Sequence, residues 1–141
     1  MKQTMKASAS CPCGGTAYAT CCGPFIDGAA IPPSAETLMR SRYTAYALRH
    51  DTYLRATWHP STCPSDSILT EDEGLQWLGL DVKSSLRLRQ RKAKQDEQPD
   101  RDSVEFVARY KIKGRAYRLH ELSRFVREGG RWFYLDGSFP E

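Results

Sequence analysis

The chain has 141 residues and a mass of 16.0 kDa, with 40% hydrophobic and 27% charged residues, a composition typical of globular proteins rather than disordered or fibrous ones. No run approaches the roughly 20 apolar residues of a membrane-spanning helix, and the basic residues 1–10 lack the apolar centre of a signal peptide. We therefore expect a cytoplasmic protein without membrane contact. The formal charge of +4 is too small to predict nucleic-acid binding by itself.

Four of the five cysteines are clustered near the start of the chain: Cys11, Cys13, Cys21 and Cys22. Thiols stay reduced in the cytoplasm, so such a cluster is expected to bind a metal rather than to form disulfides. Soft thiolate ligands favour zinc or an iron centre. Four cysteines around one Zn²⁺ leave no open position for water, so the pattern predicts a structural site and not a catalytic one.

The spacing of the cysteines suits a single ion. Glycines follow the first pair at 14–15, where the chain can turn sharply, and residues 21–24 close the loop. Four thiolates with Zn²⁺ carry a charge of about −2, so donors are needed, and the backbone N–H groups of the glycine turns are the nearest. A redox disulfide within either pair, or a set of free thiols, remains as an alternative. Cys63 stands apart and is interpreted as a plain thiol.

Helical patterns follow a Gly- and Pro-bearing connector over 25–33. Ser34 is placed to cap a helix over 35–49, in which apolar residues recur at helical spacing. Asp51 is expected to cap a shorter helix that ends at Pro60. Thr70 and Glu73 have capping-box spacing, which predicts one further turn over 71–76.

From Trp77 onward the hydrophobic pattern changes to period two, which indicates strands. The predicted strands cover residues 77–82, 85–91, 103–113, 116–127 and 131–136. Glycines at 114 and at 129–130 predict two hairpin turns, and residues 92–102 form a charged loop. Helices followed by strands predict an α+β fold, in which a curved antiparallel sheet packs on the helices.

Two stretches of the chain resemble known families. Residues 11–25 (CPCGGTAYATCCGPF) resemble the SEC-C zinc motif, named from the carboxyl-terminal tail of the SecA translocation ATPase. Segments along the rest of the chain resemble the bacterial YchJ-like family: 38–43 (LMRSRY), 57–60 (TWHP), 77–80 (WLGL), 104–110 (VEFVARY), 123–125 (SRF) and 132–137 (WFYLDG). The gap between Cys13 and Cys21 is one residue shorter than the pattern, and the second carboxyl-terminal cysteine motif of some relatives is absent.

The resemblance implies two units. A zinc knuckle over 1–30 would hold one structural Zn²⁺, and residues 31–141 would form the cone of the nuclear transport factor 2-like superfamily. In that cone, helices cover the concave face of the sheet and often leave a pocket.

Polar and aromatic residues of the helices and late strands are candidates for lining such a pocket: Arg40, Arg42, Tyr43, Tyr46, Trp58, Glu121, Ser123, Trp132, Tyr134 and Asp136. The preferred interpretation is a buried network in which Arg40 or Arg42 pairs with Glu121 or Asp136. An acid/base site would need His59 or His120 beside one of these carboxylates, and the sequence shows no such approach. His120 and Glu121 point to opposite faces of a regular strand, so they are not expected to form a dyad.

A basic outer face is expected on the strands that carry Arg109, Lys111 and Lys113 and, on the neighbouring segment, Arg87, Arg89 and Arg91. Such a face could accept nucleic-acid phosphates, but a solvated surface is the preferred interpretation, because exposed aromatics at stacking spacing are not evident. His59, in a Trp-His-Pro stretch, is expected to lie at the end of a helix. No Gly-rich phosphate loop, nucleophile elbow or zincin pattern is present, and the common hydrolases have no support.

Two hypotheses for the function follow. In the first, the chain is a zinc-binding adaptor or interaction protein; SEC-C tails contact chaperone and ribosome partners, so the resemblance implies that the knuckle recognises protein or ribosome-associated surfaces. In the second, it is a small-molecule-binding protein or an enzyme that uses the pocket around Tyr43, Glu121 and Trp132. A pocket filled by mutually satisfied ion pairs would count against the second hypothesis, and an open cavity with an unpaired carboxylate would favour it.

Overall fold

The computed structural model describes residues 10–15, 17–66, 68–69, 75–83 and 100–139. The helical turn predicted over 71–76 lies almost entirely outside the described residues. The strand predicted over 85–91, with Arg87, Arg89 and Arg91, lies completely outside them. Within the described residues, no helix is both long enough and apolar enough to cross a membrane.

The helices begin where their capping residues predict, with one exception. Helix α2 (Ala35–Ala47) is capped by Ser34, whose hydroxyl accepts a hydrogen bond from the Thr37 amide at 3.1 Å. Helix α3 (Asp51–Ala56) is capped by His50 and not by Asp51, because His50 Nδ1 accepts from the Tyr53 amide at 3.2 Å. A 3-10 turn, η1 (Tyr18–Thr20), and the single-turn helix α1 (Gly23–Ile26) precede them.

Four strands form one antiparallel sheet in chain order: β1 (Gln76–Val82), β2 (Arg101–Ile112), β3 (Arg115–Glu128) and β4 (Arg131–Ser138). The two predicted hairpin turns are confirmed. Lys113 and Gly114 have φ of 50° and 82°, and Gly129 and Gly130 have 60° and 80°. Two consecutive positive φ angles match the twist of the flanking strands in a two-residue turn.

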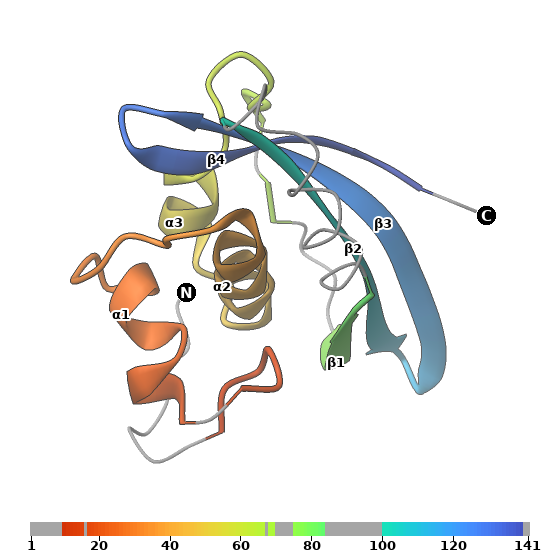
Figure 1. Ribbon diagram of the computed structural model, residues 1–141. Coiled ribbons are helices and arrows are strands. Elements are labelled where there is room, and N and C mark those ends of the chain that lie inside the picture. Colours follow the sequence, from red (N-terminus) through yellow and green to blue (C-terminus); the bar gives the residue numbers. More distant parts are fainter. Residues whose placement is uncertain (1–9, 16, 67, 70–74, 84–99, 140–141) are drawn as a thin grey trace.

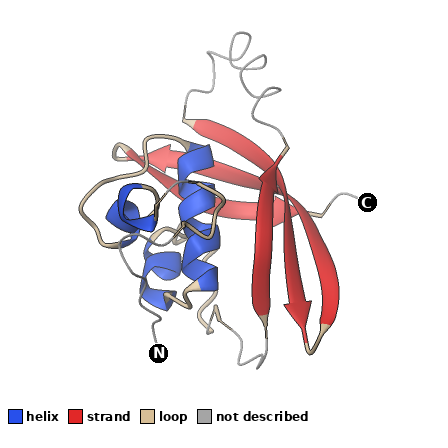
Figure 2. Cartoon of the chain, turned by 90° about the horizontal axis from the view of Figure 1, so that it is seen from below, coloured by secondary structure: helices blue, strands red, loops and turns tan. Residues whose placement is uncertain are grey.

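The sheet is strongly curved, and the helices lie against its concave face (Figures 1 and 2). Helix α2 is central to this arrangement, because it contacts β1, β2 and β4 on one side and α1 on another. One continuous core joins the helices to the sheet and includes Leu38, Ala45, Leu54, Val104 and Phe125. The structure therefore confirms the predicted α+β fold.

A register shift in the β3–β4 ladder changes which side chains face the helices. Arg124 pairs with Asp136, but the next residue, Phe125, pairs with Tyr134, so Leu135 is an extra residue on β4. A bulge of one residue reverses the alternation of faces along a strand. Tyr134 therefore faces the concave side, while Asp136 lies with Arg124 on the convex side.

The convex face is less solvated than the sequence predicts. Val107, which lies on that face between Glu105 and Arg109, is almost fully buried. Beside it, Glu105 accepts a hydrogen bond from His120 Nε2 at 2.7 Å. His120 thus has a carboxylate partner on the convex face, away from its chain neighbour Glu121, as the alternation along β3 predicts.

Candidate functional site

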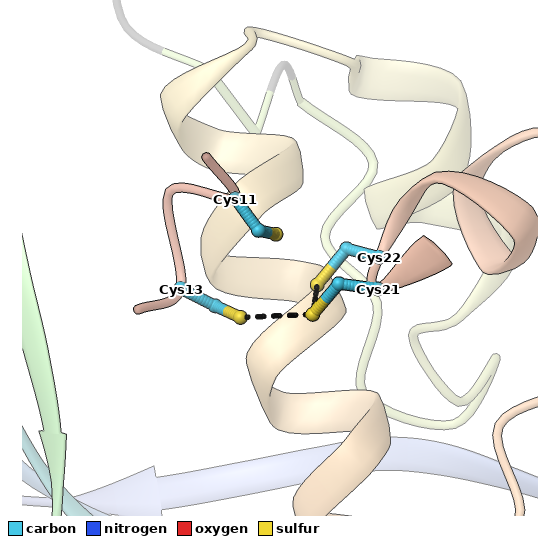
Figure 3. Close-up of side chains that lie close together, drawn as sticks. All are labelled: Cys11, Cys13, Cys21 and Cys22. Atoms are coloured by element: carbon cyan, nitrogen blue, oxygen red, sulfur yellow. Dashed lines mark hydrogen bonds between the residues drawn. The ribbon is translucent and has the colours of Figure 1, made fainter. Parts of the chain in front are cut away.

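The four clustered cysteines converge on one point at the outer side of α2. Cys11 and Cys13 come from the turn that begins the described chain, and Cys21 and Cys22 come from the link between η1 and α1 (Figure 3). Their four sulfur atoms all lie within 4.8 Å of one another. All five cysteines are free thiols, so neither pair forms the disulfide that remained as an alternative.

The distances between the sulfurs fit a tetrahedral ion. Zn–S bonds of about 2.3 Å place any two sulfurs of a tetrahedron about 3.8 Å apart. The Sγ atoms of Cys13 and Cys21 are 3.5 Å apart, and those of Cys21 and Cys22 are 4.0 Å apart. Three of the four residues are buried, which also favours a closed structural site. All separations lie within 4.8 Å, about 1 Å of the tetrahedral value, so the cluster can hold one metal ion after small adjustments of the side chains.

Gly15 is required for this approach of the two segments. A Cβ atom at position 15 would lie 2.6 Å from the Cys21 sulfur and 3.5 Å from the Cys13 sulfur. Real side chains do not approach so closely, so any other residue here would displace Cys21. The pair of glycines after Cys13 thus serves close packing as well as the turn.

The thiols perturb one another strongly. Hydrogen bonds from Cys13 and Cys22 lower the pKa of Cys11 far below its ordinary value. Hydrogen bonds with Cys11 and Cys13, followed by burial, raise the pKa of Cys22, and burial together with the same neighbours raises the pKa of Cys21 to about 11. Four thiolates therefore do not coexist here without a cation, and an entering metal must displace protons.

Helix α2 supplies two polar partners to the cluster that the sequence did not reveal. The buried hydroxyl of Thr44 lies 3.3 Å from the Cys22 sulfur and 3.6 Å from the Cys11 sulfur, so it can donate a hydrogen bond to a thiolate. Arg40 donates to the Cys13 carbonyl at 3.2 Å and pairs with Glu36 at the same distance. From the sequence, hydrogen-bond donors to the thiolates were expected only from the amides of the glycine turns. Thr44 and Arg40 were missed because contacts between distant segments leave no local sequence pattern.

Cys63 and His59 lie outside the cysteine cluster and contact other polar side chains. Cys63 lies near Arg55, whose guanidinium nitrogen is 3.8 Å from the sulfur. His59 does not cap α3, whose C-cap is Thr57; its ring lies 2.7 Å from the Ser61 hydroxyl and 2.9 Å from a Glu128 oxygen.

A cavity of about 250 Å³ lies between α2 and the concave face of the sheet. It is mainly apolar, with a few polar groups, and is lined by Met39, Arg42, Tyr43, Tyr46, Trp77, Phe106, Ala108, Leu119, Glu121, Ser123, Phe125 and Tyr134. Six of these are pocket residues predicted from the sequence. The cavity is thus on the sheet side of the same helix whose outer side supports the cysteines.

The two buried charges at the cavity have separate partners, contrary to the ion pair expected from the sequence. Arg42 donates to the Leu54 carbonyl and the Thr57 hydroxyl, both at 2.7 Å, and its guanidinium carbon is 4.7 Å from the centre of the Tyr134 ring. Glu121 accepts from the Ser123 hydroxyl at 2.6 Å and the Tyr134 hydroxyl at 3.2 Å. Within the described residues neither charge forms an ion pair.

Burial sets the protonation of these groups. It lowers the pKa of Arg42, and it raises the pKa of Tyr134, an effect that the Glu121 carboxylate strengthens. Tyr134 therefore keeps its proton and donates a hydrogen bond to Glu121. Burial likewise raises the pKa of Tyr43 to about 12.

Four predicted pocket residues do not line the cavity. Arg40 faces the cysteines, and Asp136 is carried to the convex face by the bulge in β4, where Arg124 binds it at 2.6 Å. Trp58 packs edge-on against Tyr134, with ring centres 4.9 Å apart, and its ring also contacts the Arg42 guanidinium. Trp132 lies farther along β4 and borders a second hollow, beside α1 and α3.

Gly137 is a feature of the cavity that the sequence analysis missed. It pairs with Ser123 across the β3–β4 ladder, and a Cβ atom there would overlap the Glu121 carboxylate. Glycine thus leaves room for the carboxylate against the backbone of β4. The role of Gly137 could have been predicted only from the register of β3 and β4, which the sequence does not provide.

Comparisons with known proteins agree with this geometry. The family model "YchJ, middle NTF2-like domain" matches residues 34–137. A UPF0225 protein of Ralstonia nicotianae is 54% identical over 140 residues, with 92% of this chain and 91% of the relative covered. A UPF0225 protein of Cupriavidus metallidurans is 57% identical over 139 residues and covers 94% and 91%.

Two solved structures are similar over most of this chain. The solution structure of a SEC-C motif containing protein from Rhodopseudomonas palustris has 33% identity and a TM-score of 0.75, and it covers 94% of this chain and 100% of that one. The crystal structure of a SEC-C motif containing protein from Psychrobacter arcticus has 25% identity and a TM-score of 0.69, covering 96% and 85%.

Proposed function

This chain belongs to the YchJ-like family of UPF0225 proteins, and from that premise we propose that it is a structural zinc protein of the cytoplasm whose knuckle recognises other macromolecules. The observation that carries the proposal is the convergence of four cysteine sulfurs within 4.8 Å of one another. In this role Zn²⁺ bound to Cys11, Cys13, Cys21 and Cys22 fixes the shape of the chain around it and takes no part in chemistry.

The choice of zinc follows from the donor set and from the surrounding residues. Four thiolates with a short, closed spacing favour zinc over hard cations, and the buried positions leave no space for a substrate. The hydroxyl of Thr44 offsets part of the excess negative charge. Cytoplasmic thiols stay reduced, which such a site requires.

Metal analysis tests this part of the proposal. The purified chain should contain one zinc per molecule by inductively coupled plasma mass spectrometry, and Cys11→Ser and Cys22→Ser should each lose it. Cys63→Ser is the matched control, because Cys63 lies outside the cluster, and it should retain the metal. Iron as the stoichiometric metal, or retention of zinc by both cluster variants, would contradict the proposal.

A hollow next to the knuckle supports a role in interaction. It measures about 230 Å³ and lies between the segment after α1, helix α3 and strand β4. Phe25, Ile31, Pro32, Tyr53 and Trp132 contribute to its lining. Ile31 is 49% exposed, and an exposed apolar residue beside a concave apolar surface suits contact with a protein segment.

Binding to purified bacterial ribosomes tests the interaction role, since the knuckle is proposed to contact ribosome-associated protein surfaces. The chain should co-sediment with ribosomes, and Ile31→Ser should weaken this association. Leu78→Ser is the control, because Leu78 is 54% exposed but lies on β1. Equal behaviour of the two variants, or the absence of co-sedimentation at low salt, would remove the ribosome-associated role.

The cavity favours a second candidate function, the binding of a small molecule. Half of its lining residues are aromatic, and the Glu121 carboxylate is held by hydroxyls rather than by an arginine. Such a site suits a compact ring compound with a hydrogen-bond donor. Benzamide and benzoate are suitable probes in ¹⁵N NMR titrations. Benzamide should shift the signals around the cavity, whereas benzoate should not, because Glu121 repels it. Identical responses, or none at millimolar concentration, would contradict this candidate.

A further inference from the structure

The β2–β3 hairpin is strongly basic. Its cations are Arg109, Lys111, Lys113, Arg115 and Arg118, and residues 106–120 contain no Asp or Glu. A second stretch without Asp or Glu, residues 83–94, carries six further cations, so the hairpin is one of two basic stretches of the chain. The cations nearest the hairpin turn therefore lie at the end of the sheet opposite the β3–β4 turn (Figure 1).

The charges of this hairpin are not neutralised within the described part of the chain. Lys111, Lys113, Arg115 and Arg118 form no ion pair there, and the last three are exposed. Arg109 pairs in register with Arg118, so two like charges face each other across the strands. Such pairs destabilise a sheet, and a bound anion would relieve the repulsion.

Aromatic rings form a row on the concave side of the same hairpin. Tyr110 and Tyr117 are register partners, and their rings stack with centres 5.4 Å apart and planes at 16°. Trp77 on β1 continues the row, 5.5 Å from Tyr110. Tyr117 ends it and is 41% exposed. Arg109, Lys111 and Arg118 alternate to the convex side, so the rings share the hairpin with these cations but lie on the opposite face of the sheet.

From this combination we propose that the β2–β3 hairpin binds a single strand of nucleic acid. Bases would stack on the free face of Tyr117, and the cations around the turn would contact phosphates. Every base offers a π-face, so the site would accept many sequences. A duplex hides its base faces and would engage the cations alone, and an acidic peptide would leave the ring row without a partner.

Fluorescence anisotropy with labelled ten-nucleotide strands tests the proposal on the full, metal-loaded chain. Comparison of oligo-U RNA with oligo-dT DNA shows whether the hairpin prefers RNA or DNA. Binding of either strand supports the proposed site. Affinity should fall with salt, with a log–log slope near −3, as expected when about four phosphates each contribute about 0.7. Because these strands carry no protein, the result tests the hairpin alone and is independent of the ribosome experiment, which tests the knuckle.

Variants separate stacking from charge. Tyr117→Ala should weaken binding about tenfold, within the range for loss of one stacked base, whereas Tyr117→Phe should retain it. Lys113→Gln with Arg115→Gln should reduce the salt slope by about 1.4. Phe139→Ala and Arg131→Gln are matched controls, since both residues are exposed outside the hairpin. Circular dichroism and zinc content should be unchanged in all variants.

Several outcomes would overturn the proposal. One is the absence of binding at about 50 mM salt, and another is equal loss in Tyr117→Ala and Phe139→Ala. Displacement of the strand by poly-glutamate as readily as by unlabelled RNA would show attraction by charge alone. A preference for a ten-base-pair duplex over the single strand would exclude the stacking site.

Discussion

The two sides of helix α2 build their sites in different ways. On the outer side, four cysteines from one short stretch of chain meet, and α2 adds only a hydroxyl and a guanidinium. On the inner side, the cavity draws its lining from α2 and all four strands. The first site is local in sequence and could hold a metal ion, whereas the second depends on strand register and burial. We therefore expect the two sites to respond differently to the same kind of change.

Loss of the metal should have the largest effect and should act on the outer side. Cys22→Ser, or prolonged chelation, should lower the free energy of unfolding by about 4 kcal/mol or more, the range in which loss of a metal falls. Hydrogen exchange should show protection lost first around η1 and α1, with the β2–β3 ladder retained. Equal loss of protection in the ladder would show that the sheet also depends on the ion.

Gly15→Ala should have the next largest effect, again confined to the metal side. The added Cβ would meet the Cys21 sulfur, so we expect a cost of about 2 kcal/mol and weaker zinc binding in competition with a chelating dye. Gly79→Ala is the matched control, because a Cβ there meets nothing within 4 Å. Similar zinc affinities in the two variants would contradict the close packing at Gly15.

Gly137→Ala should affect the inner side alone. Its Cβ would push the Glu121 carboxylate away from β4, at an expected cost of about 1–2 kcal/mol in thermal denaturation. The metal content should be unchanged, and NMR shifts should be confined to the cavity. A loss of zinc in this variant would break the distinction between the two sides.

Alkaline pH should produce the smallest effect and should also act on the inner side. Burial raises the pKa of Tyr43 from 10.0 to about 12, so the folded state retains a proton that the unfolded state loses. This contribution is complete below pH 10 and is lost as the pH rises through about 12. The melting temperature should therefore decline over this range, less steeply in Tyr43→Phe. An identical decline in both proteins would contradict the assignment.

The sequence predicted what depends on nearby residues. Ser34 and the apolar spacing located α2, and glycines located both hairpin turns. The clustered cysteines were enough to predict that four sulfurs converge where they could hold a metal ion. Even the error at α3 is only one residue, because His50 offers a ring nitrogen where Asp51 was expected to offer a carboxylate.

What the sequence could not predict depends on contacts between distant segments. The extra residue Leu135 reverses the faces of β4, which moved Asp136 out of the pocket and brought Gly137 against Glu121. Thr44 carries no local sign that it lies beside two cysteines. Arg42 shows that a buried guanidinium can be satisfied by a carbonyl, a hydroxyl and aromatic rings, and residue types alone favoured a carboxylate.

The continuous core has a practical consequence for dissecting this protein. Cys11, Cys13, Cys22 and Ile26 pack in the same cluster as Leu38 and the sheet residues. A fragment that starts at Ser34 would uncover the outer flank of α2 to water, so it should aggregate or melt at lower temperature than the full chain. Heterologous expression should therefore keep the cysteine segment attached.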